Sequence, residues 1–283
     1  VLMLCNQLNM TVLNVAYSGE WSHNINTLQW GVSAQHERIN DRISEWEWRD
    51  SVGYSLPTRN SDVLELYYNM HSDIRMQSTR LQAYIQDNIH WRTSAGMFSI
   101  TGGLRAHYWD YNNEFVASPR ASFTYLPGWK RNFGFRLAGG LYYQMPFYKE
   151  LRDTATNADG VTYATLNPNI RAQRTWHVVL GADYYFRLFG RPFKLTAEAY
   201  YKRGDRMISY TVDNVRIRYS GRNDSRVRTA GLDLKLYGEL VPGADSWISL
   251  SLMQSQELID GSNRGWISRP NEQRYCVSMF FQD

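Results

Sequence analysis

Histidine and cysteine are the residues best able to bind metals or act as nucleophiles, and this chain of 283 residues has six and two of them. No histidine has a second histidine four residues away, as a helical zinc site requires, and none lies beside a nucleophile motif. Cys5 and Cys276 fit neither a zinc motif nor a disulfide framework. The sequence therefore predicts no catalytic site, no metal site and no cofactor. The histidines are His23, His36, His71, His90, His107 and His177.

Glycines give no phosphate-binding loop, because no glycine cluster follows a strand and opens a helix. Those inside the expected strands are more simply explained by bends, bulges or the close packing of a neighbouring group. These glycines are Gly31, Gly102, Gly103, Gly139, Gly140 and Gly181.

Aromatic side chains beside charges give the clearest indication of ligand contact. Segment 46–54 reads W-E-W-R-D-S-V-G-Y, and segment 108–111 reads Y-W-D-Y. Rigid aromatic planes beside charged groups stack on sugars, haem or chelate rings, and they serve equally well to pack a loop against its neighbours. Two arginines of a later loop complete the set of ligand-contact candidates. The set is Trp46, Trp48, Tyr54, Tyr108, Trp109, Tyr111, Arg152 and Arg171.

Arginines recur around two of the expected loops. One interpretation is an electropositive funnel that attracts an anionic ligand. The other is that these arginines face lipopolysaccharide or line a polar interior. The sequence leaves both interpretations open. The arginines are Arg152, Arg171, Arg174, Arg203, Arg206, Arg216, Arg218, Arg222, Arg226 and Arg228.

Composition narrows the class of protein that positions these residues. Lysine and arginine number 31 against 27 aspartate and glutamate, and this net charge of +4 is too small to indicate nucleic-acid binding. Aromatic residues make up 14% of the chain, which excludes disorder. No apolar run approaches the ~18 residues of a membrane-spanning helix, so helical membrane proteins are excluded.

Alternation of apolar and polar residues runs through the chain and predicts about eleven strands, many of nine or more residues. The clearest case is 229–240, where Ala230, Leu232, Leu234 and Leu236 share one face and charged residues the other. The expected strands lie near 11–20, 28–38, 81–91, 97–108, 117–126, 133–144, 175–187, 193–202, 229–240, 247–256 and 273–283.

Connections alternate between tight turns and longer loops, which is typical of an antiparallel meander forming part of a transmembrane β-barrel. Tight turns are expected near 22–26, 92–95, 127–131, 188–191 and 242–245. Longer loops are expected around 39–79, 145–173, 204–226 and 257–272. Strands of about ten residues suit a tilted membrane span, and aromatics near the strand ends predict two girdles. Asp87 shares the apolar face, and we expect it near the turn-side interface, where a carboxylate costs little.

Several short motifs resemble the barrel of the TonB-dependent outer-membrane receptors. Segment 84–88 (Y-I-Q-D-N), segment 102–108 (G-G-L-R-A-H-Y), segment 118–125 (S-P-R-A-S-F-T-Y), segment 142–151 (Y-Y-Q-M-P-F-Y-K-E-L) and segment 167–170 (N-P-N-I) follow in the family's order. The motif positions given a structural role are Tyr84, Gln86, Asp87, Pro119, Arg120, Gln144, Pro146, Glu150 and Leu151.

The resemblance implies a bacterial outer-membrane barrel of about 22 strands, filled by a plug domain and driven by the TonB energy-transducing complex. Residues 1–283 would be a partial β-barrel domain, with the plug and both chain ends outside this sequence. The implied function is import of a small to medium ligand, such as a metal chelate, haem, cobalamin, an oligosaccharide or a peptide. Outer-membrane lipid and lipopolysaccharide are implied partners, a surface lipoprotein is a further candidate, and nucleic acid and enzymatic activity are not expected.

Two other interpretations of the same pattern remain open. A complete small outer-membrane barrel could act as a passive porin, or as a barrel hydrolase with an Asp/His or Ser/His set on one rim. Both competitors predict that 283 residues close on themselves and that the chain ends in an aromatic residue, whereas this chain ends in Gln282-Asp283.

Overall fold

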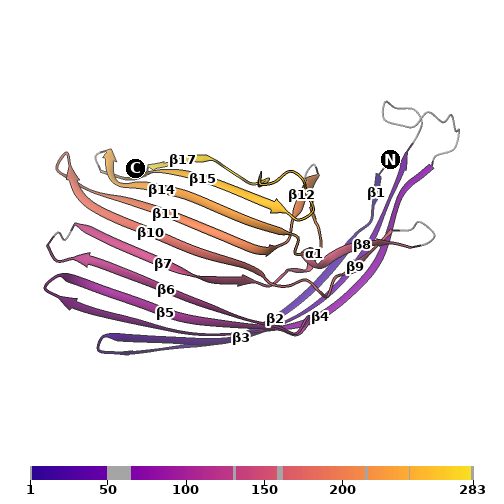
Figure 1. Ribbon diagram of the computed structural model, residues 1–283, viewed down its shortest axis with the longest axis horizontal. Coiled ribbons are helices and arrows are strands. Elements are labelled where there is room, and N and C mark those ends of the chain that lie inside the picture. Colours follow the sequence, from indigo (N-terminus) through magenta and orange to yellow (C-terminus); the bar gives the residue numbers. More distant parts are fainter. Residues whose placement is uncertain are drawn as a thin grey trace.

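A single antiparallel sheet makes up most of the protein. The computed structural model describes residues 2–49, 65–129, 132–157, 162–213, 216–241 and 243–281. Figure 1 shows the sheet as one curved wall in which strands that follow each other along the chain lie side by side. The long strands are β2 (Gln7–His23), β3 (Asn26–Arg49), β4 (Glu65–Thr93), β5 (Gly96–Trp109), β6 (Glu114–Pro127), β7 (Phe133–Gln144), β10 (Gln173–Leu188), β11 (Arg191–Met207), β14 (Ser225–Val241), β15 (Ala244–Ile259) and β17 (Tyr275–Phe281).

Each of the eleven expected strands is confirmed by one of these elements, because period-2 alternation is a reliable signal in long strands. Shorter elements lie in the connections. No helix among the described residues is long and apolar enough to span a membrane. The shorter elements are β1 (Leu2–Leu4), α1 (Tyr148–Leu151), β8 (Arg152–Thr156), β9 (Thr162–Leu166), β12 (Tyr210–Asp213), β13 (Arg216–Tyr219) and β16 (Ile267–Ser268).

Tight turns and long connections lie at opposite ends of the wall. The tight turns gather at the left of Figure 1, whereas α1, β8, β9 and β12 lie toward the right. The expected long loop at 39–79 is wrong over much of its length, because β3 runs on to Arg49 and β4 starts at Glu65. These two strands pair residue by residue along this extension, from Ile39 opposite Met76 to Glu47 opposite Tyr68. They therefore project well beyond their neighbours.

The two faces of the wall differ in polarity. We call outer the face that carries Val15, Leu104 and Leu180, whose side chains are 64%, 47% and 58% exposed. A soluble protein rarely exposes so continuous an apolar surface, whereas lipid requires one. The inner face carries residues of the other parity, such as Arg136 and Asp183, and the long connections fold over it.

One of the two aromatic girdles expected from the sequence crosses the outer face close to the tight turns. Phe98 on β5 stacks between Trp91 and Tyr125, with ring centroids 5.5 and 4.7 Å apart. Phe133 continues the girdle to Tyr184 on β10 at 4.6 Å. Amphipathic and aromatic rings favour the headgroup level of a bilayer, so this girdle marks one membrane interface.

Asp87 lies on the outer face, as its parity in the sequence suggested. It is opposite Leu28 and Gly102, six residues before β4 ends at Thr93. Its Oδ1 atom is buried without a hydrogen-bond partner. Its place near the turn-side interface stays a prediction.

Glycines on the inner face make room for aromatic rings of the next strand. A Cβ atom added at Gly31 would lie 2.4 Å from Cε1 of Tyr84, and one at Gly231 would lie 2.3 Å from Cζ of Tyr200. Each tyrosine ring therefore lies flat across the backbone of its neighbour. Close packing is the correct explanation of Gly31 among those the sequence left open.

Substitution of Gly31 by alanine should destabilise the barrel by about 1–3 kcal/mol, because the ring of Tyr84 must leave its place. Gly102→Ala is the matched control, since a Cβ there meets nothing within 4 Å. Urea unfolding of the full-length protein in detergent micelles measures the stability of both variants. Equal unfolding midpoints for the two variants would show that Tyr84 does not depend on Gly31.

Candidate functional site

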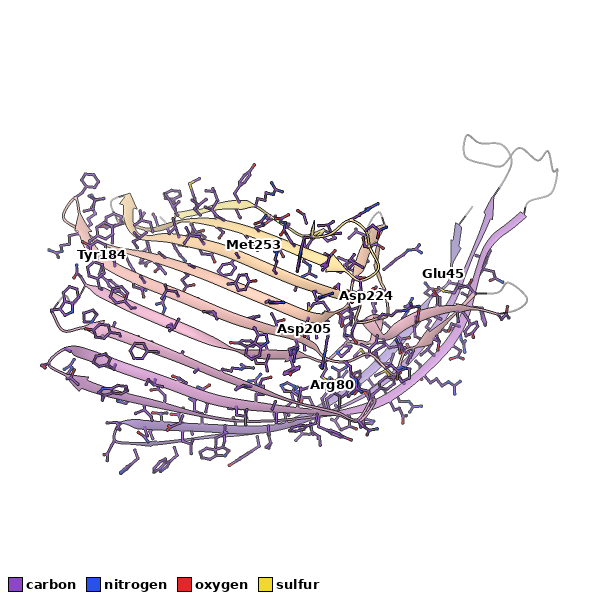
Figure 2. All side chains as sticks on the ribbon, viewed as in Figure 1. Glu45, Arg80, Tyr184, Asp205, Asp224 and Met253 are labelled. Carbon is purple, nitrogen blue, oxygen red and sulfur yellow. The ribbon has the colours of Figure 1, made fainter. Side chains whose placement is uncertain are left out.

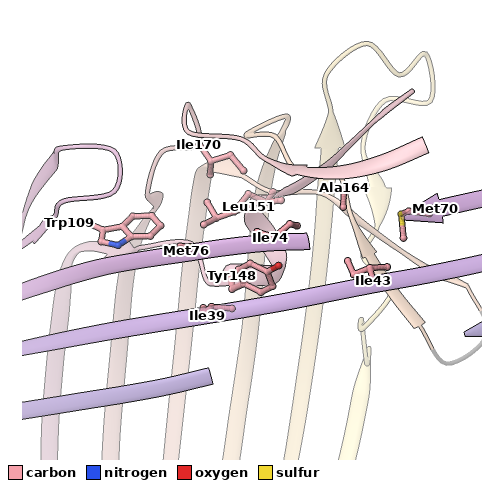
Figure 3. Packing of buried hydrophobic residues seen from close by; sticks show 11 residues of the cluster. Ile39, Ile43, Met70, Ile74, Met76, Trp109, Tyr148, Leu151, Ala164 and Ile170 are labelled. Carbon is pink, nitrogen blue, oxygen red and sulfur yellow. The ribbon is translucent and has the colours of Figure 1, made fainter. Parts of the chain in front are cut away.

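A buried cluster joins the long connections to the projecting ends of β3 and β4. Ile39 and Ile43 of β3 and Met76 of β4 lie on the inner face and pack with Tyr148 and Leu151 of α1, each 7% exposed or less. Figure 3 shows these side chains meeting above the two strands. The projecting ends of β3 and β4 are thus paired with each other, while their inner face is covered by α1. We call this set the rim cluster; it also includes Met70, Ile74, Trp109, Ala164, Ile170 and Ile208.

Asp41 is a buried carboxylate at the centre of the rim cluster. It accepts a hydrogen bond from the Tyr148 hydroxyl at 2.7 Å and forms an ion pair with Arg152 at 3.3 Å. Burial raises the pKa of Tyr148 above its ordinary value, and the carboxylate of Asp41 raises it further. Tyr148 therefore stays a neutral donor, and the loop after α1 is tied to a strand more than a hundred residues earlier.

Arg80 forms a second link between strand and loop. Its guanidinium pairs with the buried Glu37 at 3.1 Å, donates to the carbonyl of Pro146 at 2.8 Å and lies 4.4 Å from the ring centroid of Trp109. Ser78 donates to the same Glu37 carboxylate. One cation thus satisfies a buried acid, a backbone carbonyl and an aromatic face. Figure 2 places Arg80 at the end of the wall that carries the long connections.

Glu150 closes α1 and joins it to the next long strand. Its Oε2 accepts from the backbone N–H of Phe147 at 3.1 Å, and its Oε1 accepts from Gln173 at 3.0 Å. Burial raises the pKa of Glu150, while these two hydrogen bonds act in the opposite direction. Together with the Arg80 bond to Pro146, these contacts account physically for the pattern P-x-x-x-E in segment 146–150.

Asparagines tie the remaining connections together. Asn167 caps its own turn by accepting from the Asn169 N–H at 2.9 Å, and it donates to the Gly221 carbonyl at 2.9 Å. Asn112 donates to the Ile170 carbonyl at 2.8 Å. Side-chain bonds of this kind replace the backbone pairing that loops lack. The connections therefore form one bonded layer.

Below the rim, the inner wall carries a charge network. Arg136 on β7 bonds to Asp183 on β10 and, at 2.8 Å, to Glu198 on β11. Lys194 lies 3.4 Å from Asp183, which also accepts from Thr196. The guanidinium crosses directly over Gly181, where an added Cβ would be 3.2 Å from the Nη2 atom.

A more basic level lies between this network and the rim. Arg120 lies 4.7 Å from the ring centroid of Tyr142, which in turn stacks on His177 at 4.3 Å. Arg105 lies 5.6 Å from the ring centroid of Tyr84. Within the described residues no group of three or more acidic, histidine or cysteine side chains could hold a metal ion. The wall can therefore offer charge, stacking and hydrogen bonds to a passing solute.

The ligand-contact candidates fall in different environments. Trp109 is wholly buried and Tyr111 stacks on it at 5.1 Å, while Arg152 pairs with Asp41. Arg171 is exposed. The structure places Trp46 half-buried on the projecting end of β3, two residues before Trp48, and Tyr108 on the outer face with its hydroxyl bonded to Asn113. Tyr54 lies outside the described residues.

Residues that organise the rim were largely missed by sequence reasoning. Glu37 lies in the expected strand 28–38 but was not singled out, Asp41 lies in a segment expected to be a loop, and Tyr148 lies in a helix of four residues. A usable signal was present: 36–43 and 70–78 alternate in parity, as the other strands do. No local sequence pattern marks Asn223, because it bonds to backbone groups of Arg171 and Arg206, far away in the sequence.

Replacing Arg80 with alanine should loosen α1, because a buried Glu37 would lose its cation, at a cost of about 3–5 kcal/mol. Arg75→Ala is the control on the same strand, since its side chain is 78% exposed and lies 3.7 Å from Asp73. Hydrogen exchange of segment 145–152 in the full-length protein measures the effect. Unchanged exchange in Arg80→Ala would contradict the role given to this ion pair.

Comparison with known proteins agrees with this architecture. The family described as TonB dependent receptor-like, beta-barrel matches residues 6–266, whereas no curated protein sequence matches the chain. The siderophore receptor PirA from Acinetobacter baumannii superposes with a TM-score of 0.60 at 13% identity, over 98% of this chain and 40% of PirA.

Two further solved structures are similar at the same level. The pyoverdine outer membrane receptor FpvA from Pseudomonas aeruginosa PAO1 gives a TM-score of 0.57 at 13% identity, covering 99% of this chain and 40% of FpvA. The outer membrane transporter YddB from Escherichia coli gives 0.55 at 14% identity, covering 88% and 34%. The chain thus spans well under half the length of these proteins. Because the family match covers most of its residues, the chain belongs to the β-barrel family of TonB-dependent receptors, in the bacterial outer membrane.

Proposed function

We propose that this chain is part of the wall of an active importer that moves a small to medium ligand across the outer membrane. The observation that carries the proposal is the polarity of the wall. The outer face is apolar, while the inner face is lined from the rim to the tight turns by charged and aromatic groups such as Arg80, Arg120, Tyr142 and Arg136. A wet or plugged interior tolerates such groups, whereas lipid does not.

The rim cluster would hold the ligand-capturing loops in place. Residues already bonded within it, such as Trp109 and Arg152, would act by positioning, because their polar groups or faces are occupied. Direct contact falls more naturally to Trp46 and Tyr111, and Trp48 and Tyr54 stay candidates from the sequence alone. Affinity would come from these loops together with a plug supplied by the rest of the receptor.

The ligand class stays open within the proposal. The solved neighbours include a siderophore receptor, a copper transporter and a peptide transporter, so the shared fold does not select one cargo. Metal chelates, haem, cobalamin, oligosaccharides and peptides remain the candidates. The TonB complex is the proposed energy source, and a surface lipoprotein is a candidate partner.

A small closed porin or barrel hydrolase is the weaker alternative. Among the described strands, β2 pairs only with β3 and β17 pairs only with β15, so the wall has two open edges. Open edges are not tolerated at membrane depth, and further strands are needed to close the wall. This favours a larger barrel.

Uptake by cells that express the full-length receptor tests the proposal. The probes are iron-55 bound to pyoverdine or enterobactin, ionic copper and a labelled oligopeptide mixture. We expect accumulation of one probe that disappears in cells lacking TonB and in cells treated with a protonophore. Equal entry with and without TonB would instead indicate a passive pore and would reject active import.

A further inference from the structure

The outer face of the wall has an opening at the level of the long connections. Strands β6 and β7 pair only up to Arg120 opposite Gly140, although each continues beyond that point, to Glu114 and to Gln144. A cavity of about 820 Å³ lies where the two strands separate. Its lining includes Phe115, Tyr143 and Arg206 from the ends of β6, β7 and β11, and Arg171 and Asn223 from the connections.

Asn223 holds the two arginines of this cavity in place. Its Oδ1 accepts from the Arg171 N–H at 2.7 Å, and its Nδ2 donates to the carbonyls of Arg171 and Arg206 at 3.0 and 2.6 Å. Arg206 has a φ of 53° and lies within the register shift between Gly204 and Met207. A left-handed conformation is unfavourable for arginine, so the surrounding bonds must fix it.

Neither guanidinium has an acidic partner within the described part of the chain. Glu114 also lines the cavity, but it is buried and its Oε2 accepts from the Ala172 N–H at 2.8 Å and from Asn112. The nearby Arg174 is neutralised by Asp205 at 2.6 Å. Two cations at an open cavity therefore lack a counterion of their own.

An apolar groove adjoins the basic cavity on the same face. It has a volume of about 430 Å³ and is lined by Val15, Val32, Leu81 and Tyr108, and by Phe115. Phe115 is shared by the two hollows and is 65% exposed. A ligand that occupies both needs an anionic head and an apolar chain, which is the chemistry of a lipid.

The depth of the site agrees with a lipid headgroup. Arg174 is paired in register with Tyr143, and the next outer-face pair toward the tight turns is Trp176 with Leu141. The basic cavity therefore begins where the apolar span ends. Long loops of such barrels face the outside, so this level corresponds to the headgroups of the outer leaflet.

We propose that this double hollow is a binding site for a phosphate-bearing lipid of the outer leaflet. Arg171 and Arg206 bind the phosphate, since guanidinium groups bond phosphate oxygens in a bidentate manner. An acyl chain lies in the groove beside Phe115. The site is separate from the inner wall, so the proposal stands whether or not the receptor imports its ligand by the proposed route.

Binding of purified lipid A to the full-length receptor in detergent micelles tests the site. The double variant Arg171→Gln/Arg206→Gln should bind bisphosphorylated lipid A at least about tenfold more weakly, because two charge-assisted contacts are lost. The matched control is Arg187→Gln/Arg222→Gln, which makes the same change of charge at an exposed residue of the tight-turn rim and at another loop arginine. The control should bind as the unmodified receptor does.

Three further measurements make the outcome decisive. With dephosphorylated lipid A, the double variant and its control should bind with equal affinity. Millimolar inorganic phosphate should not displace lipid A, since it lacks the acyl chain. Phe115→Ala should weaken binding of lipid A as well. Equal binding of lipid A by the double variant and the control would overturn the proposal, as would full displacement by inorganic phosphate. Heat stability of each variant checks that it is folded.

Discussion

Hydrogen bonding of the backbone in lipid is the constraint on which this structure depends. A bilayer offers no partner to an N–H or C=O group, so every such group at membrane depth must be paired within the protein. Adjacent strands of the wall therefore pair residue by residue, as β10 and β11 do from Arg174 to Leu188. Alternation of side chains then follows of itself, and it leaves one face for lipid and the other for a polar interior.

Several charged side chains of the inner face are paired with one another. Arg136 reaches across Gly181 to acids on two strands, and Tyr84 and Tyr200 lie flat over glycines. These contacts run across the strands, perpendicular to the backbone ladder. They stiffen the wall and at the same time keep a charged, aromatic surface along the proposed route of the ligand.

At the rim, β3 and β4 have a second role, which the lipid environment does not require. Beyond the membrane, β3 and β4 continue to Arg49 and from Glu65, and their inner face is covered by the rim cluster and not by a lumen. The buried acids Glu37 and Asp41 are each matched by an arginine, Arg80 and Arg152, that comes from another part of the chain. Buried charge is strongly destabilising when one partner is removed. The Asp41–Arg152 pair therefore fixes the segment after α1 over β3, whereas the Glu37–Arg80 pair joins β3 to β4 and leaves Arg80 to bond the carbonyl of Pro146.

The eleven strands, the two faces, the tight turns and the family could all be predicted from the amino-acid sequence. The alternation over 229–240 or 175–187 can be recognised without knowing any distant partner. In a membrane strand every second side chain faces lipid and is therefore apolar. The family's short motifs 84–88, 102–108 and 118–125 lie inside β4, β5 and β6, and the other two lie in or beside the connection between β7 and β10.

The rim cluster and the hydrogen bonds of Asn223 to Arg171 and Arg206 become visible in three dimensions alone. Segment 39–43 is polar enough to look like a loop, and its burial depends on α1, more than a hundred residues later. Arg171 lies in a connection and Arg206 near the end of β11, and Asn223 joins their backbones. Such contacts combine residues that no local pattern links, so pairing and register across strands, and not periodicity along them, set these positions.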